Sequence, residues 1–444
     1  MTPMRKHAET IYQAALNAVN AENCVARHLH RAGNRLSLGE TEFDLAGVEN
    51  IYIIGAGKAT AHMAAAVESV LDDRITSGII TVKYGHTACL KTISTIEAGH
   101  PVPDENGIRG ANLIMETAKK AGEKDLVICL LSGGGSALIP LPAPGLTLAE
   151  KQETIRHLLA CGADIEEVNA IRKHISSIKG GQLAKAAAPA AVVTLIVSDV
   201  VGDKLDVIAS GPTVEDISTF ARCLEIIKKY DLAGRLPGTV VKRISQGANR
   251  QIAETPKPGE LNRDKLFNLV VAGNFAALSA AAEHAGYLGY NTLILSSMIE
   301  GDTTEAARFH AAVAKQVSDT GHPVAPPACI ISGGETTVRI QGDGHGGRNQ
   351  EFCLAMATEI QNYGSIVTLC AGTDGTDGPT DAAGAIADSE TVSRAEALGL
   401  DSRTFLMKND SYHFFNHTGE LLVTGPTGTN VMDVRIILIG HPIP

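Results

Sequence analysis

The feature that most constrains the fold is a short apolar run that ends in a glycine-rich turn and leads into a helical pattern. The clearest examples are IYIIGAGKA (51–59), LVICLLSGGGSAL (126–138), VVTLIVSDVVGD (192–203), LVVAGNFAAL (269–278), CIISGGETTV (329–338) and IVTLCAGTDGTDG (366–378). Continuous apolar runs of this length are typical of buried parallel strands. Helical patterns at 108–122 and 275–289 lie between such runs. Alternating strands and helices predict a parallel, three-layer α/β architecture.

The number of these strand ends is too large for one small sheet, and a chain of 444 residues is long enough for two or three domains. The polar stretch 247–266 contains two prolines and is the best linker candidate. We therefore expect an N-terminal domain of residues 1–240 and a C-terminal domain of residues 241–444, with 271–321 assignable to either.

Charge and apolar patterning exclude two classes of partner. The formal net charge is −11, and no run of Lys or Arg supplies the basic face that a nucleic-acid binder needs. No apolar stretch approaches the ~18 residues of a membrane helix, and the N-terminus has no secretory signal pattern. The eight cysteines are dispersed without a CxxC pair, which suits a reducing compartment. We expect a cytoplasmic protein with no nucleic-acid or membrane partner.

Two glycine-rich turns are candidate anion sites. In GAGKAT (55–60), Gly55 and Gly57 allow close approach of an anion and Lys58 adds a positive charge. A tight structural turn explains this motif equally well. In SGGGSAL (132–138), three consecutive glycines between strand and helix can form a nest of N–H donors. Here the anion site is the favoured interpretation.

The segment VNAIRKHISSIKGGQLA (168–184) forms a local positive island in an acidic chain. On a helix, Arg172, Ser176 and Lys179 are spaced to share one face. From this spacing alone, a solvated basic helix is the favoured interpretation.

Carboxylates cluster after two of the predicted strands. Asp199 comes directly beyond the strand 192–197, where doubly wound sheets place functional side chains. Helix capping and turn formation explain its position as well. Asp374, Asp377 and Asp381 crowd one glycine-rich loop, which favours a cation such as Mg²⁺ over a simple turn.

The segment 333–355 contains a literal GxGxxG, formed by Gly342, Gly344 and Gly347. This spacing suggests a dinucleotide fingerprint, but no good candidate exists for the acidic residue expected ~20 residues later. Arg348 follows the loop directly, and a guanidinium there suits a phosphoryl group or a carboxylate.

Taken in chain order, the motifs resemble one family. These are GAGKA, HPVPDENG (100–107), SGGGSAL, NAIRKHISSIKGGQLA, SDVVGD with SGPT, GGETTVRIQGDGHGGRNQE and AGTDGTDGPTDAAGA. They resemble the class II glycerate 2-kinases, whose C-terminal portion is called MOFRL, from about residue 8 to near the C-terminus. The resemblance implies transfer of the γ-phosphoryl group of ATP to the 2-hydroxyl of D-glycerate, giving 2-phosphoglycerate and ADP. It also implies two α/β domains, the N-terminal one Rossmann-like, with the active site in the interdomain cleft.

The resemblance implies that Lys58 and Arg348 are functional residues, and phosphoryl transfer needs cations, a Mg²⁺ ligand and a substrate anchor. The resulting candidates are Lys58, Arg348 and Asp199 as catalytic residues; Gly133, Gly134, Gly135, Ser136 and Lys179 for the substrate or a phosphate; Gly55, Gly57, Gly344 and Gly347 for the nucleotide; and Asp199, Asp374 and Asp377 for the metal. Whether Asp199 or Asp374 binds Mg²⁺ or accepts the hydroxyl proton stays open. The implied partners are glycerate and ATP with Mg²⁺ or another divalent cation, and a homo-oligomer is left open.

Two other functions compete with the kinase. An NAD(P)H-dependent hydroxypyruvate reductase is supported by the GxGxxG at 342–347 and by the frequent labelling of family members as such reductases. A non-enzymatic sensor of small anions would bind without turnover, and the acidic loop 374–381 argues against it.

Overall fold

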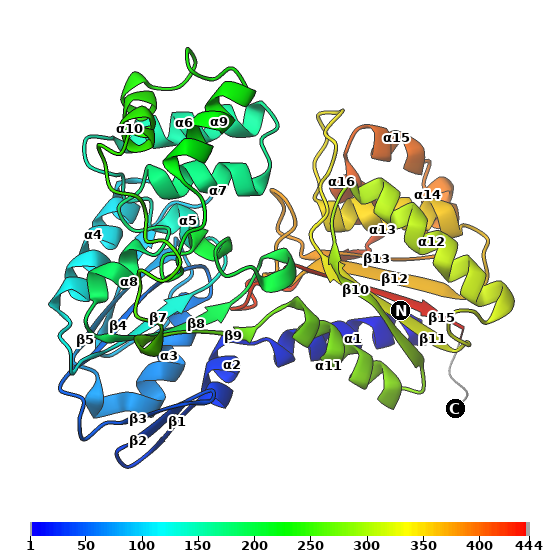
Figure 1. Ribbon diagram of the computed structural model, residues 1–444. Helices are drawn as coiled ribbons and strands as arrows, with labels where there is room; N and C mark the ends of the chain where they lie inside the picture. The colour runs from blue at the N-terminus through cyan, green and yellow to red at the C-terminus, as the bar shows by residue number, and fades with distance from the viewer. Residues whose placement is uncertain (1, 441–444) are drawn as a thin grey trace. The chain divides into compact units, whose positions relative to one another are not determined.

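The computed structural model describes residues 2–440, and the chain divides there into two compact units. Unit 1 contains residues 2–20, 199–202 and 272–440, and unit 2 contains residues 21–198 and 203–271. The chain therefore begins in unit 1, builds unit 2 and then returns (Figure 1).

The elements of unit 2 are α2 (Ala21–His28), β1 (Leu29–Ala32), β2 (Arg35–Leu38), β3 (Thr41–Asp44), β4 (Ile51–Ala56), α3 (Thr60–Leu71), η1 (Asp72–Arg74), β5 (Ser77–Lys83), β6 (Ile93–Ala98), α4 (Glu105–Lys120), β7 (Leu126–Leu131), α5 (Gly135–Leu138), α6 (Leu148–Ala160), α7 (Ile165–His174), α8 (Gln182–Ala187), β8 (Ala191–Val197), η3 (Ile208–Ser210), α9 (Phe220–Lys229), α10 (Gly238–Ala248), η4 (Arg263–Lys265) and β9 (Leu266–Ala272). The main sheet has the order β6-β5-β4-β7-β8-β9, and the pairs from β6 to β8 are parallel. Every residue of β4 and β7 is buried, which explains their continuous apolar sequences. The parallel α/β prediction is confirmed for this unit.

Two parts of unit 2 were not expected from the sequence. The strands β1, β2 and β3 form a small antiparallel sheet of their own. The helices α6, α7, α9 and α10 form a group that Figure 1 shows apart from the sheet. This group has its own apolar core, which includes Leu158, Ile171 and Phe220.

The elements of unit 1 are α1 (Pro3–Ala18), η2 (Val201–Asp203, which ends one residue into unit 2), α11 (Asn274–Tyr287), β10 (Asn291–Ile299), α12 (Thr303–Thr320), β11 (Ala328–Gly334), α13 (Arg348–Ile360), β12 (Ile366–Gly372), β13 (Gly384–Asp388), α14 (Thr391–Ala397), α15 (Ser402–Met407), α16 (Ser411–Thr418), β14 (Leu421–Leu422) and β15 (Asp433–Ile439). The sheet has the order β10-β11-β15-β12-β13-β14.

The expectation of a parallel sheet is wrong for unit 1. Only β10 and β11 pair in parallel, whereas β15 lies antiparallel between β11 and β12, and β13 is antiparallel to β12. The strands β11, β12 and β15 are buried along their whole length. Burial on both faces produces the same continuous apolar pattern whatever the strand direction, so the sequence pattern could not reveal the difference.

The change of unit falls between Val271 and Ala272 rather than near residue 240. The polar stretch 247–266 does not separate the units, because it leads into β9, which is the edge strand of the sheet of unit 2. Of the segment 271–321, which the sequence left open, residues 272–321 belong to unit 1 and Val271 belongs to unit 2.

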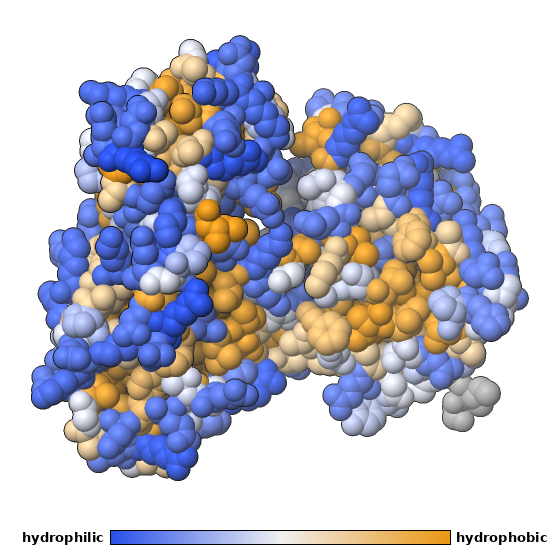
Figure 2. Space-filling view, viewed as in Figure 1, coloured by the Kyte–Doolittle hydropathy of each residue, from blue (hydrophilic) through white to orange (hydrophobic). Residues whose placement is uncertain are grey.

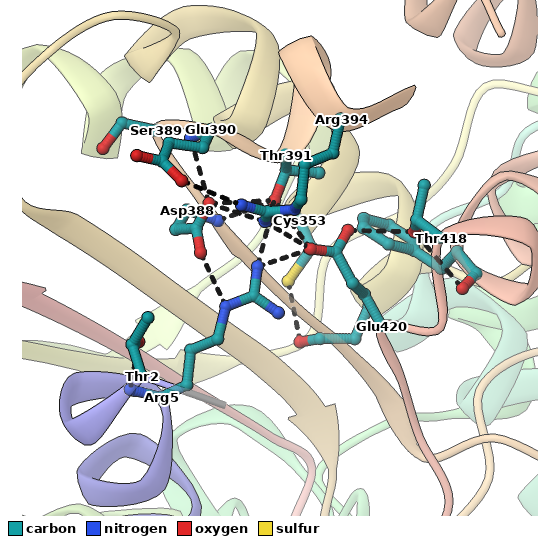
Figure 3. A network of polar contacts seen from close by, with 12 residues as sticks. Thr2, Arg5, Cys353, Asp388, Ser389, Glu390, Thr391, Arg394, Thr418 and Glu420 are labelled. Atoms are coloured by element: carbon teal, nitrogen blue, oxygen red, sulfur yellow. Dashed lines mark hydrogen bonds and ion pairs between the residues drawn. The ribbon is translucent and has the colours of Figure 1, made fainter. Parts of the chain in front are cut away.

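The N-terminal helix α1 belongs to unit 1 because a buried ion network fixes it there (Figure 3). The Arg5 guanidinium donates from Nε to Asp388 at 2.6 Å and from Nη2 to Glu420. Arg394 donates to the same two carboxylates, at 2.7 and 2.6 Å. The side chains of Arg5, Asp388 and Glu420 are 12%, 12% and 3% exposed, so solvent screens the network weakly.

One face of unit 1 exposes apolar side chains. Figure 2 shows apolar surface where β10 and α12 lie, and Met298 and Phe309 on these elements are 60% and 56% exposed. The strand β10 is an edge of its sheet and is at most partly buried along its length. An association of copies of this chain stays a prediction. Within residues 2–440, no helix is long and apolar enough to cross a membrane.

We expect Arg5→Ala to lower the free energy of unfolding of unit 1 by about 2 kcal/mol or more, because it leaves two buried carboxylates with one cation. Chemical denaturation measures this loss. The matched control is Arg35→Ala, because Arg35 pairs with Glu42 at side-chain exposures of 66% and 51%. That variant should lose less than about 1 kcal/mol. Equal losses in the two variants would contradict the role assigned to Arg5.

Candidate functional site

Two glycine-rich loops of unit 2 lie against each other because β4 and β7 are parallel neighbours. The pair Ala56 and Leu131 ends the ladder, so the two turns start at the same edge of the sheet. The Lys58 amide donates to the Gly133 carbonyl at 2.8 Å, and the Ser132 amide donates to the Ala56 carbonyl at 3.1 Å. The Lys58 side chain is thereby placed beside the triple-glycine turn.

The glycines of the first loop serve this close approach. A Cβ on Gly55 would collide with the Leu130 carbonyl, and one on Gly57 would collide with Ser132. Gly57 also has φ 148°, and its amide donates to the Thr81 carbonyl at 3.1 Å. Because this amide is already used, the structure favours Gly55 and Gly57 as residues that position Lys58 over the predicted role of nucleotide ligands.

The second loop keeps donors for a ligand. Gly134 has φ 84°, and the Gly135 amide donates to the Ser132 carbonyl at 3.2 Å. Among the described residues, the amides of Gly133 and Gly134 have no hydrogen-bond acceptor. The Lys179 ammonium donates to the carbonyl and the hydroxyl oxygens of Ser136, at 2.8 and 2.9 Å. The structure thus brings together the predicted set of three glycines, Ser136 and Lys179.

The prediction of a solvated basic helix at 168–184 is wrong. The helix α7 ends at His174, and Lys173 and Lys179 are 3% and 2% exposed. Lys173 is paired with the buried carboxylate of Asp216 at 3.2 Å. Lys179 instead contacts neutral oxygen atoms of Ser136 and Ala209.

A cavity of about 620 Å³ lies in front of the triple-glycine loop. The residues that line it are His100, Pro101, Val102, Pro103, Gly134, Ser136, Ala137, Pro140, Leu148, Lys151, Gln152, Ile155, Arg156, Leu159, Arg172 and Lys179. This set, all within the described residues, contains four Lys or Arg side chains and no carboxylate. We call it the cationic pocket.

Burying the cations of this pocket costs free energy as long as no ligand is bound. Lys151 is 6% exposed, and its ammonium donates to the Pro140 carbonyl at 2.6 Å. Burial, together with the nearby Arg172 and Arg243, lowers the pKa of Lys151 to about 7. Burial, together with Lys151 and Arg172, also places the pKa of Lys179 well below its usual value. Like charges gathered in a buried site without counter-charges favour a bound anion.

Arg348 opens α13 in unit 1 and is held by carboxylates. Its Nε and Nη2 donate to the two oxygens of Asp433 at 2.7 and 3.0 Å, and its Nη1 lies 2.7 Å from Glu335. Burial alone would lower the pKa of Arg348, but Asp433, Glu335 and Asp377 raise it above the usual value. A guanidinium has five N–H groups, so these contacts leave N–H groups for a ligand.

Asp433 is the positioning residue that sequence analysis missed. It is fully buried and also accepts from Asn349 at 3.0 Å and from Arg435 at 3.4 Å. Asp433 begins β15, 85 residues after Arg348, so no local spacing connects the two.

Two of the three glycine amides of the GxGxxG loop are already used inside the protein. The amides of Gly342 and Gly344 donate to Asn409 Oδ1 and the Lys408 carbonyl, at 2.9 and 2.8 Å. A Cβ on Gly344 would lie 2.5 Å from the Asp410 Cβ, and one on Gly347 would collide with Asp377. These glycines pack chain segments closely, so the structure disfavours the predicted nucleotide role of Gly344 and Gly347.

Among the predicted metal ligands, Asp377 is already held by backbone amides. Both oxygens of Asp377, which is 1% exposed, accept from the backbone amides of Asn349 and Gln350, at 3.0 and 2.8 Å. Burial raises the pKa of Asp377 to about 7, although these amides and Arg348 oppose the shift. Among the described residues, no group of three or more His, Cys, Asp or Glu side chains could hold a metal ion.

The other two predicted carboxylates are also placed in unit 1. Asp374 accepts from the amide and hydroxyl of Thr376, at 3.0 and 2.9 Å, which forms a local turn. Asp199 follows β8 as predicted and accepts from the Asn430 side chain at 3.2 Å.

Comparison with known families accounts for most of the chain. Residues 7–245 match the model described as a domain of unknown function, DUF4147, and residues 328–433 match the MOFRL family. The second match confirms the resemblance noted for the C-terminal part of the sequence.

Known proteins are similar over nearly the whole length. The glycerate 2-kinase of Pyrococcus horikoshii is 40% identical over 429 residues, which cover 96% of this chain and 93% of that protein. A protein of Agrobacterium vitis provisionally named a hydroxypyruvate reductase is 45% identical over 390 residues, 87% of each chain. The crystal structure of a glycerate kinase from Thermotoga maritima superposes with a TM-score of 0.86 at 38% identity, covering 98% of this chain and 99% of that one.

The low pKa of Lys151 makes stability depend on pH. Between pH 7 and about 10 the unfolded chain keeps the Lys151 proton, whereas the folded chain has lost it. Wild type should therefore gain stability relative to Lys151→Met as pH rises through this window, by at most about 1.4 kcal/mol per pH unit. Denaturation in buffers without phosphate measures this difference. A difference that stays constant or falls with pH would contradict the buried, uncompensated lysine.

Proposed function

The chain belongs to the glycerate kinase family, and from this we propose that it is a glycerate 2-kinase. It transfers the γ-phosphoryl group of ATP to the 2-hydroxyl of D-glycerate and releases 2-phosphoglycerate and ADP. The observation that supports this function best is the cationic pocket, which is formed without a carboxylate directly beside the loop that carries Lys58. ATP and glycerate are both anions, and such a pocket suits either.

The proposed reaction needs cations at the transferred phosphoryl group, and Lys58 and Arg348 are our candidates. Lys58 of unit 2 and Arg348 of unit 1 neutralise the oxygens of the γ-phosphoryl group, whose charge redistributes in the transition state. Asp433 keeps the planar fork of Arg348 in one orientation through two hydrogen bonds. The location of the active site in a cleft between the domains stays a prediction.

The acceptor must lose a proton during the reaction. The 2-hydroxyl oxygen of glycerate bonds to the γ-phosphorus as the bond from that phosphorus to the β,γ-bridging oxygen breaks, and the hydroxyl proton passes to a carboxylate. We propose Asp199 or Asp374 for this step, because Asp377 is buried and held by backbone amides.

We propose that the divalent cation arrives bound to ATP. A kinase requires such a cation to neutralise the phosphates. The described residues contain no group of three or more His, Cys, Asp or Glu side chains for a resident metal, and we assign Asp199, Asp374 and Asp377 no step through the metal.

The reductase alternative has weaker structural support. It depends on the GxGxxG loop, in which the amides of Gly342 and Gly344 donate to Asn409 and Lys408 and are not left for a pyrophosphate. The name of the Agrobacterium vitis relative keeps this function worth testing.

Product analysis tests the proposed function directly. Incubation with Mg-ATP and D-glycerate should give ADP and 2-phosphoglycerate, and excess EDTA should abolish the reaction until Mg²⁺ is restored. A parallel assay follows NADH oxidation with hydroxypyruvate. NADH turnover without ADP formation would replace the kinase by the reductase, and 3-phosphoglycerate as the product would correct the position of transfer.

Arg348→Lys keeps a positive charge but loses the planar fork that Asp433 orients. We expect kcat to fall on the order of 10²-fold, with a larger loss, on the order of 10³-fold, in Arg348→Ala. Steady-state kinetics with ATP and D-glycerate measure both variants.

The thermal midpoint of each Arg348 variant separates chemistry from folding, because removing the arginine also removes a partner of the buried Asp433. A variant that is folded and keeps the wild-type kcat would exclude Arg348 from catalysis. A raised KM for ATP at unchanged kcat would make it a binding residue only.

A further inference from the structure

We propose that the cationic pocket of unit 2 is the nucleotide site of this kinase, with the phosphates at its inner, cationic end and the purine ring against its apolar rim. This inference rests on the proposed function, and it states where one of the two substrates, ATP, binds. It differs from the sequence expectation, which gave the nucleotide to Gly55, Gly57, Gly344 and Gly347.

The charge of the pocket suits a ligand with several negative charges. Lys151, Lys179 and Arg172 have no carboxylate partner in the part of the chain that the structure describes. They donate to neutral oxygen atoms, such as those of Pro140 and Ser136. A single carboxylate of glycerate would compensate one of these cations, whereas a triphosphate compensates all of them.

The helix α6 gives the pocket a direction. Lys151, Ile155 and Leu159 are spaced four residues apart, so they lie in one row along the helix. Lys151 is 6% exposed at the inner end of the row, Ile155 is partly buried, and Leu159 is 60% exposed. The row thus runs from a buried cation to an exposed apolar side chain.

A second segment also places an exposed apolar side chain at the pocket. Val102, in the turn after β6, is 67% exposed and lines the same cavity as Leu159. Arg156 also lines it, and a guanidinium can stack on a purine ring. Two exposed apolar side chains at the mouth of a cationic pocket suit a flat apolar ring, and glycerate has no such group.

The size of the pocket agrees with this occupant. A cavity of about 620 Å³ falls within the range of about 300–1,000 Å³ that holds drug-sized ligands, and a three-carbon acid would leave most of it empty. The inner end lies beside Gly134, where a Cβ would come within 3.4 Å of the Lys58 side chain. A nucleotide held this way directs its phosphates toward the proposed catalytic lysine.

A cavity of unit 1 that is slightly larger than the cationic pocket lacks these properties. Its volume is about 760 Å³, and its lining includes three arginines but also four carboxylates. Arg308, for example, pairs with Glu305 at 2.6 Å. Because carboxylates already balance its arginines, this cavity is less suited to bind a polyanion than the cationic pocket is.

Calorimetric titration of the full chain with ADP and, separately, with inorganic pyrophosphate tests the assignment. Leu159→Ala should weaken ADP binding about tenfold through lost contact with the base, and should leave pyrophosphate binding unchanged. Lys151→Met should weaken both ligands on the order of 100-fold. The matched control is Leu398→Ala in unit 1, because Leu398 is also 60% exposed, and it should change neither.

The outcomes separate this inference from the proposed function. Unchanged ADP binding in Leu159→Ala would overturn the base site, and that variant should fold because the side chain is exposed. In Lys151→Met, weaker binding of D-glycerate in the same kind of titration, with unchanged ADP binding, would indicate that the pocket binds the acceptor acid. That result would overturn the inference but would not contradict the proposed kinase activity. A third outcome is that the wild-type chain forms no phosphoglycerate while Leu159→Ala still weakens ADP binding and leaves pyrophosphate binding unchanged. That combination would support the nucleotide site and reject the kinase.

Discussion

The parallel pairing of β4 with β7 is the constraint on which the functional part of unit 2 depends. It brings two turns to one sheet edge so closely that Gly55 and Gly57 have no room for a side chain. The amide of Lys58 is then fixed by the Gly133 carbonyl, and the lysine side chain lies beside the triple-glycine turn. The glycines of the first loop are therefore explained by contact between backbones, and those of the second loop by the donors that they leave for a ligand.

The buried cations around Arg348 and those of the cationic pocket have different partners. In unit 1, Arg348 is matched by Asp433 and Glu335, so its charge and orientation are settled before any ligand arrives. In unit 2, Lys151 and Lys179 are buried among neutral oxygens, and their pKa values are lowered. The first arrangement suits a residue that must act with a fixed geometry. The second suits a residue whose charge is stabilised by the ligand itself, so that binding and protonation are coupled.

The sequence predicted what local patterns determine. The strands β4, β7, β8, β9, β11 and β12 were recognised because buried strands are continuously apolar, and Ser136 and Lys179 were found within short, distinctive segments. The antiparallel insertion of β15 was missed, because an apolar pattern carries no information on direction. Asp433 was missed because it meets Arg348 across 85 residues. The sequence does contain a signal for Lys151, because this lysine interrupts the row of apolar residues along α6.

The path of the chain has a consequence for the order of folding during synthesis. Helix α1 is made before unit 2, yet it packs on α11, and Arg5 binds carboxylates at positions 388 and 420. Unit 2 has all its residues once position 271 has been made, so it can fold while α1 still has no partner surface. During translation, α1 is therefore an amphipathic helix whose apolar side stays without its partner surface until α11 and the later strands of unit 1 have been made, so a chaperone that shields such helices would find a target in the segment that precedes unit 2.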